Sequence, residues 1–173
     1  MAKKKTQTEP GALEPEGEKI PSRLGILKKL RVVIRAAQRH SLWIEKQCGV
    51  SGAQLWIMQE LHENSGLRVG ELANKLAIHQ TTTSNLLDAL EKRGYVVKAR
   101  DAKDQRVVKV KLTEEGALTL SHAPTPARGL LPEALMQMDE TSLALLDQGL
   151  QGLLNSIDVL DEGFGMLPLP FTM

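Results

Sequence analysis

Cysteine is nearly absent from this sequence, because Cys48 is the single residue of its kind. An internal disulfide is therefore excluded, and a reducing compartment is favoured. The sequence also has no apolar run of about 18 residues, which a membrane-spanning helix needs. Its opening, MAKKK, has the charge of a signal-peptide start, but the polar stretch TQTEPGALEPEGE follows where an apolar one would be required. These absences predict a cytoplasmic protein.

Clusters of metal-binding or catalytic residues are missing too. The histidines His40, His62, His79 and His122 are scattered and have no cysteine neighbours, so no metal site is predicted. Paired carboxylates, a nucleophile with an adjacent base and a phosphate-cradling glycine loop do not stand out. The sequence therefore predicts neither an enzyme nor a protein with a cofactor.

Net charge is small, at +1 from 22 lysines and arginines against 21 aspartates and glutamates. This balance argues neither for a nucleic-acid partner nor against one. The charges are nevertheless unevenly distributed. Residues 68–111 contain ten basic and five acidic side chains, net +5, whereas residues 114–173 contain one arginine and nine carboxylates, net −8. A basic region thus precedes an acidic C-terminal third.

The sequence does contain enough apolar material for one core. Its 173 residues, 42% of them hydrophobic, fit a single domain with tails. Residues 1–20 are rich in Lys, Glu, Pro and Gly, which predicts a flexible N-terminal tail. The basic run Lys3 to Lys5 would at most add a salt-dependent attraction to DNA.

Apolar periodicity predicts a long amphipathic helix over residues 23–47. Ser51 and Gln54 have the spacing of a capping box, which predicts that a second helix begins there. The apolar positions of the first helix follow one another in steps of three and four: Leu27, Leu30, Ile34, Ala37, Ser41 and Ile44.

The C-terminal third is expected to be helical, with an interruption at Pro124 and Pro126. Thr113 and Asp139 are predicted to cap helices there. The last helix, over residues 140–160, has leucines on more than one side, which one monomer cannot easily bury. The apolar, proline-rich tail that follows is expected either to pack on a partner or to fray.

A helix-turn-helix pattern occupies the centre of the chain. Residues 70–92 form two predicted helices with a tight turn at residues 77–79, and Gly94 closes the second one. The second helix begins with short hydrogen-bonding residues where strong helix formers are usual. Those expected on its outer surface are Gln80, Thr81, Thr82, Ser84 and Asn85. Such side chains suit close approach to DNA, because they donate to phosphates, and an amide can bond adenine bidentately.

A hairpin with a charged tip follows, in the stretch YVVKARDAKDQRVVKVKL. Alternation places Val108, Val110 and Leu112 on one face of the second strand. Taken alone, its connection could be a solvated turn. After a helix-turn-helix, the same hairpin reads as a wing whose basic residues reach the DNA: Arg100, Lys103 and Arg106, the last held by Asp104.

In this order, residues 50–119 resemble the MarR (multiple-antibiotic-resistance regulator) family of winged helix-turn-helix regulators. The stretches that carry the resemblance are VSGAQLWIMQEL, RVGELANKLAIHQTTTSNLLDALEKRGYV and DQRVVKVKLTEEG. Asp104 and Arg106 match the family's Asp-x-Arg, and Leu112, Thr113 and Gly116 match its Leu-Thr-x-x-Gly. The chain departs from the family pattern at His79 and Asn85, where Ser and a basic residue are frequent, so no operator sequence can be inferred.

The resemblance implies a mainly α (α+β) fold in which residues 50–113 form the DNA-binding lobe. Residues 21–48 and 114–160 would form a helical dimerisation region, between an N-terminal tail at 1–20 and a C-terminal tail at 161–173. The implied function is that of a homodimeric repressor on a palindromic operator, released by a small aromatic or phenolic ligand.

Candidate ligand-binding residues lie on the first two predicted helices, which line the ligand cavity in relatives. They are His40, Trp43, Gln54 and Trp56. An indole and an imidazole suit an aromatic acid, whereas the alternative is that both tryptophans anchor the core or the dimer.

Two other functions remain open from the sequence. Cys48 could be the thiol of a redox-sensing regulator, although a buried structural cysteine is the more common case. The lobe could also be a protein-interaction module without DNA affinity, whose binding would not fall steeply with salt.

Overall fold

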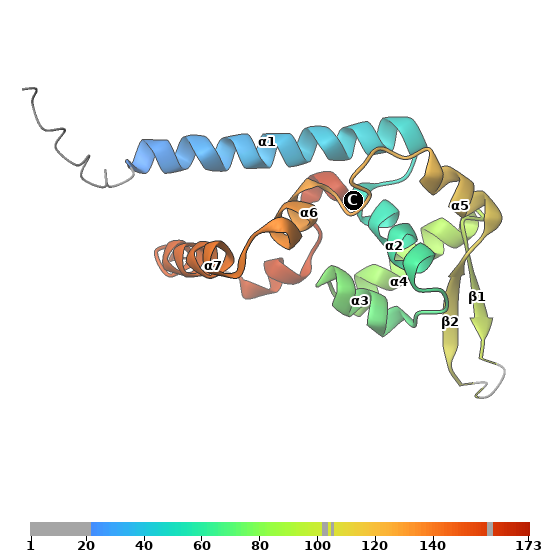
Figure 1. The fold of residues 1–173 in the computed structure, drawn as a ribbon. Helices are drawn as coiled ribbons and strands as arrows, with labels where there is room; N and C mark the ends of the chain where they lie inside the picture. Colours follow the sequence, from blue (N-terminus) through green and yellow to red (C-terminus); the bar gives the residue numbers. More distant parts are fainter. Residues whose placement is uncertain (1–21, 102–103, 105, 159–160) are drawn as a thin grey trace, which may run out of the picture.

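The computed structural model describes residues 22–101, 104, 106–158 and 161–173, and is mainly helical with one small sheet (Figure 1). This confirms the predicted fold class. The N-terminal tail at residues 1–20 and Lys103 lie outside the described residues. The elements are α1 (Arg23–Cys48), α2 (Gly52–Glu63), α3 (Val69–Leu76), α4 (Gln80–Lys92), β1 (Val96–Arg100), β2 (Val108–Leu112), α5 (Glu114–Ser121), α6 (Leu130–Gln137) and α7 (Glu140–Leu154), followed by the 3-10 helices η1 (Glu162–Met166) and η2 (Pro170–Thr172).

Helix α1 is the long amphipathic helix that the periodicity predicts. It begins after Ser22, whose hydroxyl accepts a hydrogen bond from the Gly25 N–H at 3.0 Å, and it ends at Gly49 with φ of 66°. Its buried residues all lie in its C-terminal half, and its N-terminal half projects past the lobe (Figure 1). Leu27 and Ile34, on the predicted apolar face, are therefore 40% and 52% exposed.

Helices α2, α3 and α4 enclose the core. Both hydrogen bonds of the predicted capping box between Ser51 and Gln54 form at the start of α2. Every position predicted to face inward from α3 and α4 is buried: Leu72, Ala73, Leu76, Thr83, Leu86, Leu87 and Leu90. The turn between the two helices passes through Ala77 with φ of 52°, and Gly94 follows α4 with φ of 76°. Because a left-handed residue ends the path of a helix, these two positions fix where α3 and α4 stop.

Strands β1 and β2 form the antiparallel hairpin, with Val96 opposite Leu112 and Arg100 opposite Val108. An isolated antiparallel bridge joins Leu67, just before α3, to Val110. Val110 is fully buried, and it anchors the hairpin to the core.

The Leu-Thr-x-x-Gly stretch joins the hairpin to α5. The Thr113 hydroxyl caps α5 by accepting from the Gly116 N–H at 3.0 Å, and it donates to the Gly94 carbonyl oxygen at 2.6 Å. A Cβ on Gly116 would lie 2.2 Å from the carbonyl oxygen of Tyr95. Only glycine allows α5 to start this close to the end of α4.

Helices α6 and α7 follow the predicted interruption, and the Asp139 side chain caps α7 as predicted, accepting from the Ser142 N–H at 2.9 Å. Helix α7 ends at Leu154, earlier than the predicted residue 160. None of its residues is buried, and Figure 1 shows it apart from the lobe, below the N-terminal half of α1. Its leucines thus remain at the surface of the single chain.

The C-terminal segment, residues 161–173, differs from its prediction. It packs on α1 and α2 of its own chain through η2. The Ser41 hydroxyl donates to the Phe171 carbonyl oxygen at 2.5 Å, and the His79 N–H donates to the Met166 carbonyl oxygen at 3.0 Å. These contacts join residues far apart in sequence, which periodicity does not reveal.

Candidate nucleic-acid interface

Helix α4 presents the polar surface that the sequence predicts near its beginning. Gln80, Thr81 and Asn85 are exposed, whereas Thr82 and Ser84 are half-buried. Thr83 between them is fully buried, and its hydroxyl donates to the His79 carbonyl oxygen at 3.1 Å. Because residues four apart share a helix face, Thr81 and Asn85 lie one above the other on the exposed side.

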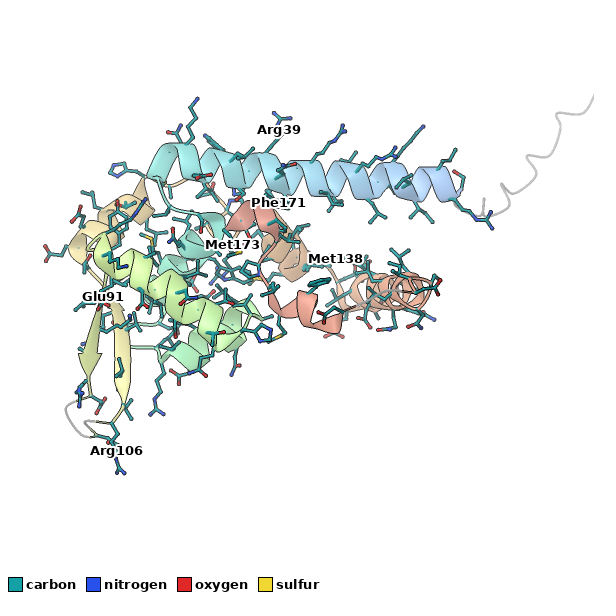
Figure 2. The ribbon with its side chains drawn as sticks, turned by 180° about the vertical axis from the view of Figure 1, so that it is seen from behind. Arg39, Glu91, Arg106, Met138, Phe171 and Met173 are labelled. Carbon is teal, nitrogen blue, oxygen red and sulfur yellow. The ribbon has the colours of Figure 1, made fainter. Side chains whose placement is uncertain are left out.

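The wing ends in Arg106, which lies at its tip in Figure 2. The Arg106 side chain is 94% exposed, and its Nε lies 3.4 Å from Oδ1 of Asp104. The same carboxylate oxygen accepts from the Arg106 backbone N–H at 3.0 Å. Asp104 therefore orients the arginine, as the sequence predicts, while leaving most of the guanidinium in solvent.

A second acidic residue organises the base of the wing. Oδ2 of Asp101 lies 2.5 Å from Nζ of Lys109, and the Asp101 N–H donates to the Val107 carbonyl oxygen at 2.8 Å. Arg100 is exposed at the end of β1. The wing thus carries its cations on a backbone that local hydrogen bonds hold in shape.

One groove connects the helix-turn-helix and the wing. Its lining includes Arg68 before α3, Gln80 at the start of α4 and Arg106 on the wing. Arg68 is exposed, and its backbone N–H is bonded to Glu71 at the first turn of α3. Arg68 is not among the DNA-binding residues that the sequence predicts, although it begins the basic region at residues 68–111.

Other basic residues of the lobe form contacts within the protein. Lys98 on β1 pairs with Asp88 and Glu91 on α4, and its Nζ lies 3.0 Å from Oε2 of Glu91. Arg93 donates to the Gly49 carbonyl oxygen and thereby links the end of α4 to the end of α1. These cations hold the wing and α1 against α4.

A cavity of about 410 Å³ lies between α1, α2, the turn before α4, α6 and the C-terminal segment. His40 and Trp56, both predicted ligand-binding residues, line it. Trp43 does not, because it points outward from α1 with 51% of its surface exposed, where its ring meets the edge of His40 at 6.0 Å. Gln54 also lies outside the lining, since its side chain accepts the Ser51 N–H in the capping box. The structure thus brings two of the four predicted residues to the cavity.

A cluster of charges borders the cavity, whose lining includes Arg128 of this cluster. Glu60 on α2 is buried, and its carboxylate accepts from Trp56 Nε1 at 3.0 Å and from Arg128 Nε at 2.8 Å. Nζ of Lys75, on α3, lies 3.0 Å from the same carboxylate. Burial alone would raise the pKa of Glu60, but the hydrogen bonds from Arg128, Lys75 and Trp56 outweigh it and hold the pKa below its ordinary value.

Cys48 is half-buried against the core at the end of α1. Burial raises the pKa of its thiol, which disfavours the reactive thiolate. Over the described part of the chain, no group of three or more His, Cys, Asp and Glu side chains is arranged to hold a metal. No helix of that part combines the length and apolarity needed to cross a bilayer.

Comparison with known proteins places these elements in a family. The MarR family model matches residues 50–108. The uncharacterized HTH-type transcriptional regulator YsmB of Bacillus subtilis is 26% identical over 74% of this chain and 88% of its own. The transcriptional repressor MdtR of the same organism is 26% identical over 58% of this chain and 64% of its own, which is less than two thirds of its length.

Among solved structures, the transcriptional regulator BldR of Sulfolobus solfataricus is similar with a TM-score of 0.52. It is 26% identical, over 82% of this chain and all of its own (100%). The matched region coincides with the lobe that carries α4 and the first strand of the wing. This winged helix-turn-helix lobe, residues 50–108, matches the MarR family of transcriptional regulators.

Proposed function

We propose that this protein is a homodimeric repressor that binds a palindromic operator and is released from it by a small aromatic or phenolic ligand. The observation that carries the proposal is the pairing of a short-side-chain polar face on α4 with an exposed, carboxylate-oriented arginine on the wing, on one side of the lobe. A recognition helix in the major groove and a wing arginine in the flanking minor groove have this geometry.

The polar face of α4 supports base reading in the major groove. Gln80 and Asn85 expose amides that can bond adenine bidentately, and Thr81 exposes a hydroxyl for phosphate or base contacts. Thr82 and Ser84 are half-buried beside them. Because their side chains are short, the helix backbone can come close to the bases. Arg100, Lys103, Arg106 and the additional Arg68 would supply the phosphate and minor-groove contacts.

Exposed apolar surface supports dimerisation. Val32, Val33 and Ile34 of α1 and the leucines of α7 are large apolar residues that remain exposed in the single chain. Many large apolar side chains exposed on two helices are unusual on a monomer and typical of an interface. A second copy that covers both helices would bury it and would set the two recognition helices about 34 Å apart, one turn of DNA.

The cavity supports effector control. It lies where the dimerisation helix α1 meets the helix-turn-helix, so a ligand there can bias the orientation of the lobe. His40 and Trp56 supply the ring surfaces for an aromatic ligand.

Site selection from genomic DNA with the purified protein would identify the operator, and fluorescence anisotropy with that duplex would measure affinity. We expect Arg106→Ala to weaken operator binding about tenfold and to lower the salt dependence by about one phosphate contact, because it removes one minor-groove cation.

Arg39→Ala is the matched control. Arg39 is exposed on the outer face of α1, away from the wing (Figure 2), so its loss changes the net charge equally without touching the proposed DNA face. Equal affinities of the Arg106 variant and the unsubstituted protein would contradict the wing contact. Binding that hardly changes with salt would favour a protein-interaction module.

A further inference from the structure

The C-terminal segment, residues 161–173, forms one wall of the cavity. Figure 2 shows Phe171 beneath α1 and Met173 close to it. The lining residues that the segment contributes are Gly165, Leu167, Pro168, Leu169, Phe171 and Thr172. The cavity is therefore bounded on this side by the end of the chain and not by the helical framework.

Two hydrogen bonds connect this segment to different parts of the fold. At its end, the Phe171 carbonyl oxygen accepts from the Ser41 hydroxyl of α1 at 2.5 Å. Five residues earlier, the Met166 carbonyl oxygen accepts from the N–H of His79 at 3.0 Å. His79 is the residue immediately before the recognition helix α4. The segment thus links the long helix to the helix-turn-helix across the cavity.

The C-terminal segment contacts α2 closely, but its own apolar side chains remain partly exposed. A Cβ on Gly52 of α2 would lie 3.5 Å from the Cβ of Thr172, which is an ordinary contact distance, so η2 packs directly against α2 at this point. Leu167 and Leu169 are nevertheless 46% and 45% exposed. A segment with half-exposed apolar residues and few anchoring hydrogen bonds belongs to the part of a fold that opens most readily.

The polar groups around the cavity are already engaged. Arg128 is bonded to Glu60 and Glu63, and Nε2 of His40 donates to the Pro126 carbonyl oxygen at 2.9 Å. Within the described residues, no buried side-chain nitrogen or oxygen lacks a hydrogen-bond partner. A charged ligand would therefore lose its hydration without gaining a free partner, whereas a neutral apolar ligand would not.

We propose that the C-terminal segment is a displaceable wall of the cavity. A neutral, mainly apolar small molecule enters by displacing residues 161–173, and this removes the Met166 carbonyl from the His79 N–H at the start of α4. The docked segment holds the lobe in its DNA-binding orientation, and the displaced segment frees it. This inference rests on the proposed effector response. It adds the chemical class of the ligand, neutral and mainly apolar, and the segment that moves, residues 161–173.

A disulfide between α2 and the segment tests the displacement in the full chain. The substitutions Gly52→Cys and Thr172→Cys, in a Cys48→Ser background, would place two Cβ atoms 3.5 Å apart, at the short end of the range of disulfides. The probe is N-phenyl-1-naphthylamine, a neutral fluorophore that brightens in apolar surroundings. Its sulfonated analogue, 1-anilinonaphthalene-8-sulfonate, has the same rings and a negative charge. The two single-cysteine variants are the matched controls.

We expect oxidation to weaken binding of the neutral probe by at least about tenfold in the double-cysteine protein, reduction to restore it, and neither treatment to affect the controls. The sulfonate should bind at least about tenfold more weakly than the neutral probe. Equal binding by the oxidised and reduced proteins overturns the displaceable wall. Failure of the reduced protein to bind the neutral probe, or equal binding of the sulfonate, overturns the ligand class.

Hydrogen exchange of the unsubstituted protein gives a test that does not depend on the cysteine variants. The neutral probe should accelerate exchange in peptides covering residues 161–173 and in the peptide containing His79. Slower exchange there would mean that the ligand binds beneath a docked segment, and would overturn the proposal. Operator affinity is measured separately. A disulfide that blocks probe binding, together with a probe that leaves operator affinity unchanged, would contradict the proposed effector response. That result would still support the displaceable wall.

Discussion

The Glu60 cluster gives a quantitative prediction, because it places a buried carboxylate between three elements of the fold. Arg128 precedes α6, and it bonds Glu60 and Glu63 of α2, while Lys75 reaches Glu60 from α3. Replacing Arg128 by methionine keeps much of the side-chain volume and removes both hydrogen bonds. The buried Glu60 carboxylate would then retain only Lys75 and Trp56.

The expected cost follows from the burial of each partner. A hydrogen bond to a buried charged group contributes about 1.5–3 kcal/mol, which applies to the bond between Arg128 and Glu60. The Glu63 side chain is 40% exposed, so its pair with Arg128 adds at most about 1 kcal/mol. We therefore expect Arg128→Met to lower the free energy of unfolding at neutral pH by about 2–4 kcal/mol.

Urea denaturation at fixed protein concentration, followed by circular dichroism, measures this change. Adding Glu60→Gln should make the double variant lose less than the sum of the two single losses, because the uncompensated charge is gone. A loss below about 0.5 kcal/mol for Arg128→Met, or strictly additive losses, would refute the reasoning, since surface substitutions have effects of this size.

The same cluster predicts the direction of a pH effect. The folded-state pKa of Glu60 lies below its ordinary value, so unfolding takes up protons as the pH falls. The stabilisation by Glu60 is therefore complete above the unfolded carboxyl pKa of about 4.3 and is lost as the pH falls through the lowered folded pKa. Arg128→Met should shrink this acid-sensitive contribution.

Two further predictions concern the joint before α5 and the proposed dimer interface. Gly116→Ala should destabilise the fold by about 1–3 kcal/mol or prevent folding, because the added Cβ would lie 2.2 Å from the Tyr95 carbonyl oxygen. A melting temperature equal to that of the unsubstituted protein would contradict this contact. Leu150→Glu on α7 should convert the proposed dimer to monomer in sedimentation equilibrium, whereas Val97→Glu on β1, at an exposed apolar residue of the lobe, should not. A dimer that survives the first substitution would exclude α7 from the interface.

The features that sequence reasoning predicted well depend on local rules. The capping box at Ser51, the buried face of α3 and α4, and the left-handed Gly94 are each encoded within a few neighbouring residues. The Asp104 contact with Arg106 also spans only two positions. Local spacing and backbone chemistry therefore suffice to predict the DNA-binding lobe.

The features that sequence reasoning missed depend on distant contacts. Arg128 reaches Glu60 across 68 positions, and Ser41 reaches Phe171 across 130. No periodicity links such partners, so the buried carboxylate and the C-terminal wall could not be predicted. Trp43, a predicted ligand-binding residue, lies outside the cavity lining for a related reason, because the pattern of one helix does not show which side another segment covers.

The attachment of Lys98 to Asp88 and Glu91 has a consequence for the proposed release from DNA. Because this lysine fastens the first strand of the hairpin to the recognition helix, the two reading elements tilt together as one rigid piece. Any reorientation of the lobe then costs major-groove and minor-groove contacts in the same step. In the proposed operator complex, contact by the wing alone, with α4 outside the major groove, would then be disfavoured, and one rotation of the lobe would remove both sets of contacts.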